Sequence, residues 1–139
     1  MAIDPNLKHV HNALKQKKYL NKLLRSLGVD KRKVYITNVV KFFPSGHALT
    51  AKEIKAHLPF LKEEIKSVGP NIVVTLGTSA LNGIGLRQPL DNIHGKTFNL
   101  GPYNLFPTFH PKHALQSEQI RNQLEADFVK LKEIINKPN

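Results

Sequence analysis

The sequence predicts an α/β fold in three layers, with helices on both faces of a short parallel sheet. Two patterns carry this prediction. Short apolar runs rich in β-branched residues recur along the chain, and amphipathic helical patterns separate them. A length of 139 residues suits one hydrophobic core, so we expect residues 1–139 to form a single domain.

Helical and strand-like patterns alternate through the first half of the chain. Residues 7–27 carry apolar side chains at intervals of three and four with lysines opposite, which predicts a basic amphipathic helix ending at Gly28. Residues 34–40 are too uniformly apolar for a strand wetted on one face, so they predict a buried parallel strand. A capping box then predicts a helix over residues 50–68.

The second half of the chain continues this alternation. Residues 71–76 predict a second buried strand, followed at once by a tight turn and a short helix. A stretch rich in turn residues follows, with a short strand near residues 97–100. Residues 105–109 predict a third strand, which Pro107 should confine to an edge or a strand end. From Ala114 onward the pattern is again helical.

The charge is strongly positive, because 21 Lys and Arg face 10 Asp and Glu, a formal charge of +11. Such a balance indicates a polyanionic partner, either nucleic acid or a membrane surface. The absence of Cys excludes disulfides, thiolate catalysis and Cys-ligated metal within these residues. No apolar run approaches the roughly 18 residues of a membrane span, and no secretory signal is present. We therefore expect a cytoplasmic protein without a membrane partner.

Three segments should meet at one rim of the predicted sheet, since ligands of open α/β sheets bind beyond the carboxyl ends of the strands. These segments are residues 38–47, 77–79 and 110–113. His110 and His113 have a spacing that can hold a metal on a helix, but no third ligand is indicated, so we expect no metal.

Four stretches, in this order, resemble the uracil-DNA glycosylase superfamily, most closely its thermophilic family 4. They are residues 34–41, 53–61, 72–77 and 107–111, and the resemblance runs from about residue 20 to 127. The resemblance implies a three-layer α/β/α fold. It also implies a role in base excision repair, by hydrolysis of the N-glycosidic bond of a uracil flipped out of DNA.

The resemblance also implies roles for individual residues. Asn38 stands where the family keeps the amide that hydrogen-bonds uracil, and His110 stands where it keeps the imidazole that donates to uracil O2. Near Asn38, Phe42 or Phe43 is the local substitute for the ring that stacks on the base. The residues expected to contact DNA, with Leu115 as the intercalating wedge, are Lys41, Ser45, Gly46, Gly77, Thr78, Ser79, Pro111, Lys112, His113 and Leu115.

The sequence departs from the family in two respects. The first motif, a Gly-Glu-x-Pro-Gly turn that supplies the water-steering carboxylate, and the four cluster-ligating cysteines are not found in it. We expect a chain truncated at its N-terminus, without a cofactor, in which Asp4 or Asp91 is the remaining candidate acid. In the family the first motif follows a strand that lies between the strands matching residues 34–40 and 72–76. Without that strand, a sheet position beside residues 34–40 would be closed by direct pairing, a protein partner or self-association.

Two functions stay open on the sequence alone. One is a uracil-DNA glycosylase, and the other is a catalytically inactive module that binds DNA or nucleotides. Without the resemblance, Asn38 is an ordinary turn residue and His110 an ordinary loop histidine. The cations of the first helix form either a nucleic-acid face or a merely solvated one; they are Lys15, Lys17, Lys18, Lys22 and Arg25.

Overall fold

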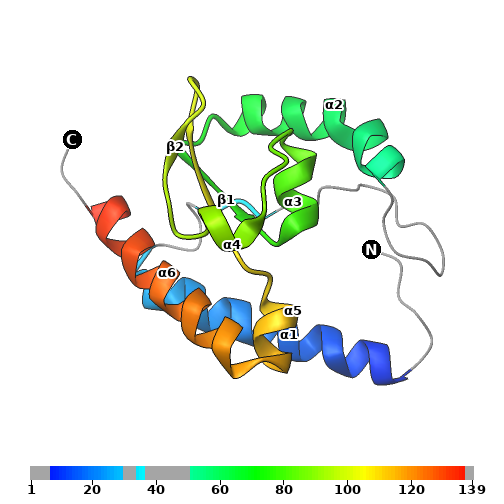
Figure 1. The fold of residues 1–139 in the computed structure, drawn as a ribbon, viewed down its shortest axis with the longest axis vertical. Coiled ribbons are helices and arrows are strands. Elements are labelled where there is room, and N and C mark those ends of the chain that lie inside the picture. Colours follow the sequence, from blue (N-terminus) through cyan, green and yellow to red (C-terminus); the bar gives the residue numbers. More distant parts are fainter. Residues whose placement is uncertain (1–6, 30–33, 37–50, 137–139) are drawn as a thin grey trace. The chain divides into compact units, whose positions relative to one another are not determined.

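The computed structural model describes residues 7–29, 34–36 and 51–136 (Figure 1). They fall into two compact units. The helical unit is drawn from residues 1–34 and 109–139, and the sheet unit from residues 35–108.

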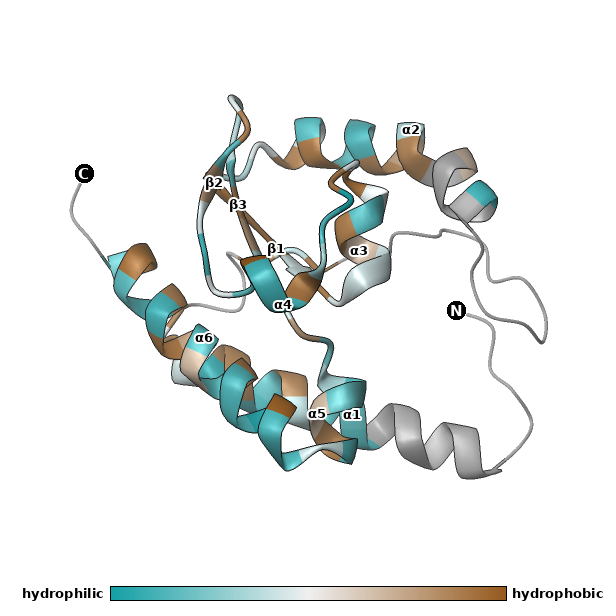
Figure 2. Cartoon of the chain, viewed as in Figure 1, coloured by the Kyte–Doolittle hydropathy of each residue, from teal (hydrophilic) through white to brown (hydrophobic). Residues whose placement is uncertain are grey.

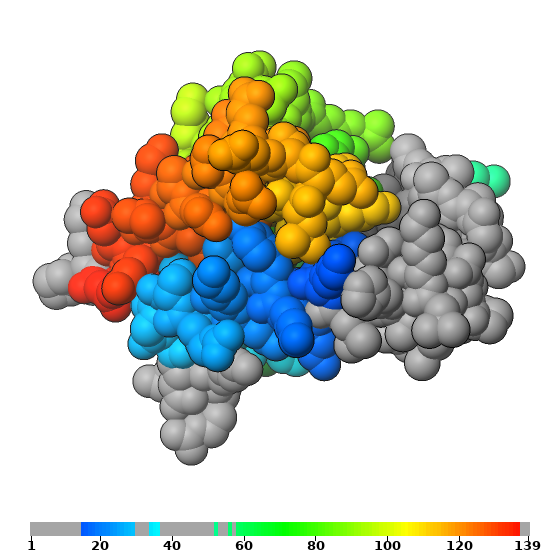
Figure 3. Space-filling model, turned by 90° about the horizontal axis from the view of Figure 1, so that it is seen from below, coloured from blue at the N-terminus to red at the C-terminus, as the bar shows by residue number. Residues whose placement is uncertain are grey.

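The helical unit contains three helices that pack against one another, as the space-filling view in Figure 3 shows. They are α1 (Leu7–Ser26), α5 (Pro111–Gln116) and α6 (Glu118–Asn136). Their buried side chains are mainly leucines and a phenylalanine, and α6 alternates hydrophobic and hydrophilic bands in Figure 2, as an amphipathic helix does. The predicted first helix is confirmed; α1 ends at Ser26, and Gly28 follows two residues later with a positive φ of 69°, which favours glycine.

The C-terminal helical region begins earlier than predicted and is interrupted. Pro111 opens α5 at a position where its missing N–H has no intrahelical partner to lose. Ser117 then adopts an extended conformation between α5 and α6, and its hydroxyl oxygen accepts the Ile120 N–H at 3.3 Å. Ser117 therefore caps α6 and separates it from α5.

The sheet unit combines helices with a mixed sheet of three strands in the order β1-β3-β2. Strands β1 and β3 are parallel, with Ile72 opposite Asn104 and Leu76 opposite Thr108, whereas β2 is antiparallel to β3. The elements are α2 (Ala51–Val68), β1 (Ile72–Leu76), α3 (Thr78–Gly83), α4 (Leu90–Ile93), β2 (Phe98–Asn99) and β3 (Asn104–Thr108). The α/β class and the strands predicted near residues 71–76, 97–100 and 105–109 are confirmed. The prediction of a wholly parallel sheet is wrong, because β2 runs antiparallel to β3.

The core of the sheet unit forms where the strands meet the short helices. Leu81 of α3, Ile93 of α4 and Leu105 of β3 are buried together, and the partly buried Val73 and Phe98 pack against them. Figure 2 shows hydrophobic residues along β1 and β3. Apart from Thr75, the residues of β1 are only half-buried, whereas Leu105 to Thr108 of β3 are fully buried.

Of the two alternatives predicted for Pro107, the edge strand is wrong, because β3 is the central strand of the described sheet. The strand end fits, because Pro107 is the penultimate residue of β3. The carbonyl of Pro107 accepts the Gly95 N–H at 2.8 Å, on the side away from β1. The amide and carbonyl of one strand residue face the same side, so the missing N–H of Pro107 also lies away from the β1 ladder. On that side β2 pairs only as far as Leu105, so no ladder bond is lost.

The prediction of a buried strand over residues 34–40 is wrong for Tyr35 and Ile36. Residues 34–36 have no regular secondary structure, and the side chains of Tyr35 and Ile36 are exposed. The phenol of Tyr35 donates to the carboxylate of Glu64 on α2 at 2.7 Å, which satisfies its hydroxyl at the surface. Residues 37–40 lie outside the described part of the chain.

Candidate active site

The carboxyl ends of β1 and β3 lie at the same edge of the sheet because the two strands are parallel. Immediately after β1, the Gly77 N–H donates to the Thr108 carbonyl at 2.9 Å, which joins the two strand ends. Gly77 has φ 90° and ψ 172°, a conformation open essentially to glycine alone. The chain turns there into α3, where Thr78 and Ser79 are exposed. The predicted turn at residues 77–79 is therefore confirmed as a structural feature of this edge.

His110 follows the end of β3 by two residues and is the N-cap of α5 in the helical unit. Its Nδ1 accepts the backbone N–H of Lys112 at 2.9 Å. A ring nitrogen that accepts a hydrogen bond carries no proton, so the neutral imidazole holds its proton on Nε2. The cap therefore fixes His110 as a hydrogen-bond donor through Nε2–H.

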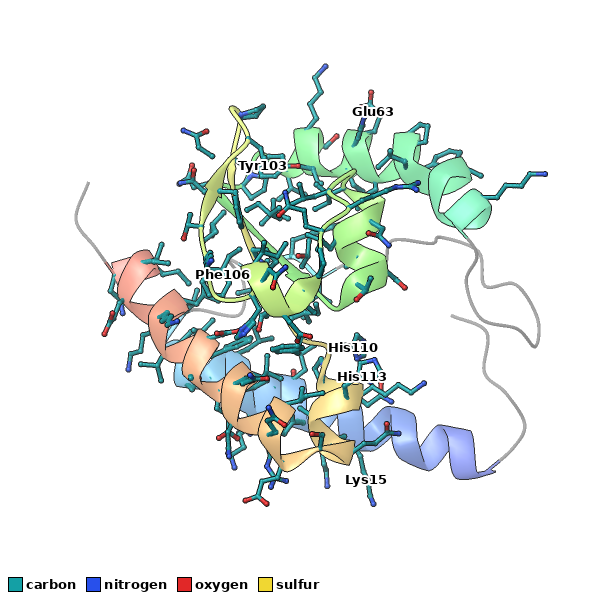
Figure 4. The ribbon with its side chains drawn as sticks, in the orientation of Figure 1. Lys15, Glu63, Tyr103, Phe106, His110 and His113 are labelled. Atoms are coloured by element: carbon teal, nitrogen blue, oxygen red, sulfur yellow. The ribbon has the colours of Figure 1, made fainter. Side chains whose placement is uncertain are left out.

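The surroundings of His110 favour this neutral form. Burial of the ring lowers the pKa of His110 below its ordinary value of 6.5, and electrostatic interaction with the neighbouring His113 and Lys112 side chains lowers this pKa further. Figure 4 shows His110 and His113 at the start of α5. At neutral pH the His110 ring is consequently uncharged: its Nδ1 accepts the Lys112 N–H, and its Nε2–H is the donor.

The remaining predicted residues of this segment share the short helix α5. Pro111 is buried and supports the turn, whereas Lys112 and His113 are exposed. Leu115 is 41% exposed, so its side chain is accessible, as the predicted wedge requires. The structure thus places four predicted residues on α5 with His110 as its cap, and Gly77, Thr78 and Ser79 at the sheet edge.

Of the remaining predicted residues, one lies within the described part of the chain. Asp91 is an exposed residue of α4. The others lie outside the described residues: Asp4, Asn38, Lys41, Phe42, Phe43, Ser45 and Gly46.

The capping role of His110 is a feature that the sequence interpretation missed. The available signal was Pro111, because proline is favoured at the first position of a helix and so marks the preceding residue as the cap. Histidine is not among the usual capping residues, which are Ser, Thr, Asp and Asn. The cap explains why the ring has one defined tautomer.

The described residues show no sign of a metal site or of a membrane-spanning helix. The 139 residues contain no Cys, so they offer no thiolate to an iron–sulfur cluster and do not fit the cluster that the family resemblance implies. Among the described residues, no three His, Asp or Glu side chains gather to hold a metal ion. No helix in the described ranges is long and apolar enough to cross a membrane.

Comparisons with known proteins agree with the predicted resemblance. The family model described as Uracil DNA glycosylase superfamily matches residues 7–132. The type-4 uracil-DNA glycosylase of Saccharolobus solfataricus is 35% identical over 130 residues, which cover 86% of this chain and 60% of that protein. The type-4 enzyme of Thermotoga maritima is 34% identical over 124 residues, or 85% and 65% of the two chains.

A more distant match supports the same family. The type-5 uracil-DNA glycosylase of Pyrobaculum aerophilum is 34% identical over 91 residues, or 63% of this chain and 40% of that protein. The chain spans 60% to 65% of the length of the type-4 relatives described above. With the family model covering residues 7–132, the chain belongs to the uracil-DNA glycosylase superfamily.

Proposed function

We propose that this protein acts in DNA repair as a uracil-DNA glycosylase, hydrolysing the N-glycosidic bond of a uracil flipped out of DNA. Membership of the superfamily and the names of the type-4 relatives support the reaction class. The observation that carries the proposal for this chain is His110, a neutral imidazole that α5 holds with Nε2–H as its donor.

The proposed chemistry places negative charge on the departing base. When the bond between the sugar C1′ and uracil N1 breaks, N1 keeps the electron pair, and the charge spreads to O2. Water supplies the hydroxyl that joins C1′, and its other proton finally neutralises the base. A donor aimed at O2 stabilises this anion, and removing one such donor typically costs about 100- to 1,000-fold in rate.

Other residues have supporting roles in the proposal. Asn38 recognises the polar edge of uracil, and Phe42 or Phe43 stacks on the base. Leu115 enters the base stack, for which its exposed apolar side chain is suited. The phosphates flanking the lesion are bound by Lys41, Ser45, Gly46, Thr78, Ser79, Lys112 and His113. Gly77, whose N–H is taken by the Thr108 carbonyl, and the buried Pro111 shape the two turns that carry these groups.

A protein partner or a second copy of the chain is part of the same proposal. Within the described sheet β1 lies at an edge and pairs with β3 alone. An edge strand presents backbone groups that another strand can pair with. The uracil-containing DNA remains the main partner, and we propose a cytoplasmic location.

The test is an excision assay. The pure protein is incubated with oligonucleotides that carry one uracil, single-stranded and duplex, and abasic sites are then cleaved with alkali. Matched oligonucleotides with thymine at that position give the background. We expect strand scission only at uracil. If stoichiometric protein gives no more scission than a His110→Asn control, the proposed enzymatic activity is refuted. Salt-sensitive binding to DNA without scission would support the inactive module instead.

A further inference from the structure

The outward face of α1 carries a stripe of four cations, which we call the α1 stripe: Lys15, Lys18, Lys22 and Arg25. Their intervals of three, four and three residues place them on one side of the helix. All four are exposed. The whole of α1 contains no Asp or Glu, so no acid within the helix offsets this charge.

The spacing of the stripe fits a phosphate backbone. Ten residues separate its ends, which at about 1.5 Å per residue is about 15 Å. One strand of B-form DNA advances about 3.4 Å per phosphate along the axis, so about four phosphates occupy the same length. Four cations along this length can therefore neutralise a similar number of phosphates.

The opposite face of α1 argues against a membrane as the partner. Leu23 on that face and Leu27 just after the helix are buried, and α1 packs against α5 and α6 in the helical unit (Figure 3). The Tyr19 phenol also donates to the Glu125 carboxylate of α6 at 3.0 Å. A basic helix that binds a membrane surface needs its apolar face free to enter the lipid. The apolar face of α1 is already occupied, whereas its charged face is open.

We propose that the α1 stripe binds the phosphate backbone of DNA, as a contact surface separate from the residues proposed to hold the uracil. It rests on the proposed function only for the choice of DNA as the polyanion. Its effect is on the affinity for DNA of any sequence, because phosphate contacts carry no base information. The stripe would hold the protein on undamaged DNA before a lesion is met.

The test compares two variants that lose the same charge. In the stripe variant, Lys15, Lys18, Lys22 and Arg25 are changed to Gln, a residue with comparable helix propensity. The matched control variant changes four exposed lysines to Gln on helices that also carry acids: Lys62, Lys66, Lys130 and Lys132. Binding of a fluorescent, undamaged duplex is measured by anisotropy across a range of NaCl concentrations.

For the stripe variant, we expect the slope of log K against log salt to flatten by about 3 to 4 units, at about 0.9 per lost phosphate contact. The control variant should keep the slope of the unchanged protein. Single variants Lys18→Gln and Lys22→Gln should each lose about 0.9 of slope, which keeps the test valid if the fourfold variant does not fold. Changing the three lysines to Arg should preserve the slope.

Equal slopes for the stripe and control variants would overturn the proposal, because only general charge would then matter. The proposal would also be overturned if the stripe variant lost binding to vesicles of anionic lipid while its binding to DNA stayed unchanged. That result would assign the stripe to membranes. Because the probe contains no uracil, the result is independent of excision. A protein without glycosylase activity would still show the flattened slope if the stripe contacts DNA.

Discussion

Two substitutions at His110 separate its structural role from its chemical one. His110→Ala removes both the acceptor that caps α5 and the Nε2–H donor. His110→Asn keeps an acceptor for the Lys112 N–H, since Asn is a favoured N-cap residue, but it removes the imidazole donor. The two variants should therefore differ in stability and agree in activity.

The size of the stability effect follows from the cap. Replacing a capping side chain with Ala costs about 0.5–2 kcal/mol, and the hydrogen bond from Lys112 is solvent-exposed, which favours the lower half of that range. We expect the free energy of unfolding to fall by about 1 kcal/mol in His110→Ala and to change little in His110→Asn. Urea unfolding followed by circular dichroism measures both values.

The size of the activity effect follows from the proposed donor. Both variants should lose about 100- to 1,000-fold in the single-turnover rate of uracil excision, because each lacks the donor for uracil O2. An Asn variant that excises uracil at the unchanged rate would refute the role of the imidazole. An Ala variant as stable as the unchanged protein would refute the cap.

Acid should destabilise the unchanged protein through the same residue. Burial lowers the pKa of His110 in the folded state, so the unfolded chain takes up a proton at His110 more readily. The stability that the folded protein has with a neutral His110 is therefore complete above the ordinary pKa of 6.5, and it is lost as the pH falls below that value. Compared with His110→Asn, the unchanged protein should lose more stability between pH 7 and pH 5. Parallel pH profiles of the two proteins would contradict this expectation.

Three further predictions concern the scaffold. The hydroxyl of Thr75 is buried with no hydrogen-bond partner among the described residues, so Thr75→Val should leave stability unchanged or raise it by about 1 kcal/mol in urea unfolding, and a clear loss would contradict it. Gly77→Ala should lower the free energy of unfolding by about 1–3 kcal/mol, because φ of Gly77 is 90°. Gly28→Asn should change it little, because Gly28 has the left-handed conformation that Asn tolerates after a helix. Equal thermal unfolding temperatures for the two variants would contradict this prediction. Burial and the hydrogen bond to Glu125 raise the pKa of Tyr19 to about 12. The stabilisation that this hydrogen bond gives the folded state is therefore lost only as the pH rises above 10. An ultraviolet titration should show one phenol with a pKa near 12, and this signal should disappear in Tyr19→Phe. A Tyr19→Phe titration identical to that of the unchanged protein would argue against this contact.

Local patterns were sufficient to predict the elements whose own residues decide their structure. The leucine spacing of α1 and the apolar run of β1 need no information from elsewhere in the chain. Pro107 suggested an edge strand as one alternative, but whether a central strand tolerates proline depends on where the neighbouring strand β2 ends and on the hydrogen bond from Gly95. A local sequence pattern contains neither. A central strand accepts proline only where its neighbour has already ended.

The candidate site was predictable in part, for a similar reason. His110 and Gly77 were found because each follows a strand, and ligands of α/β sheets gather where strands end. The tautomer of His110 was not predictable, because it depends on a hydrogen bond to Lys112 that exists only once α5 forms. The interruption at Ser117 likewise depends on a competition between continuing a helix and capping a new one.

The central claim is that α5 holds His110 as a neutral donor through Nε2–H. Nitrogen-15 NMR of the histidine side chains tests it most directly, with His110→Asn used to assign the signals. At pH 7 the account predicts a bare Nδ1, a protonated Nε2 and a titration midpoint below 6.5. A proton on Nδ1, or a charged ring at pH 7, would contradict it.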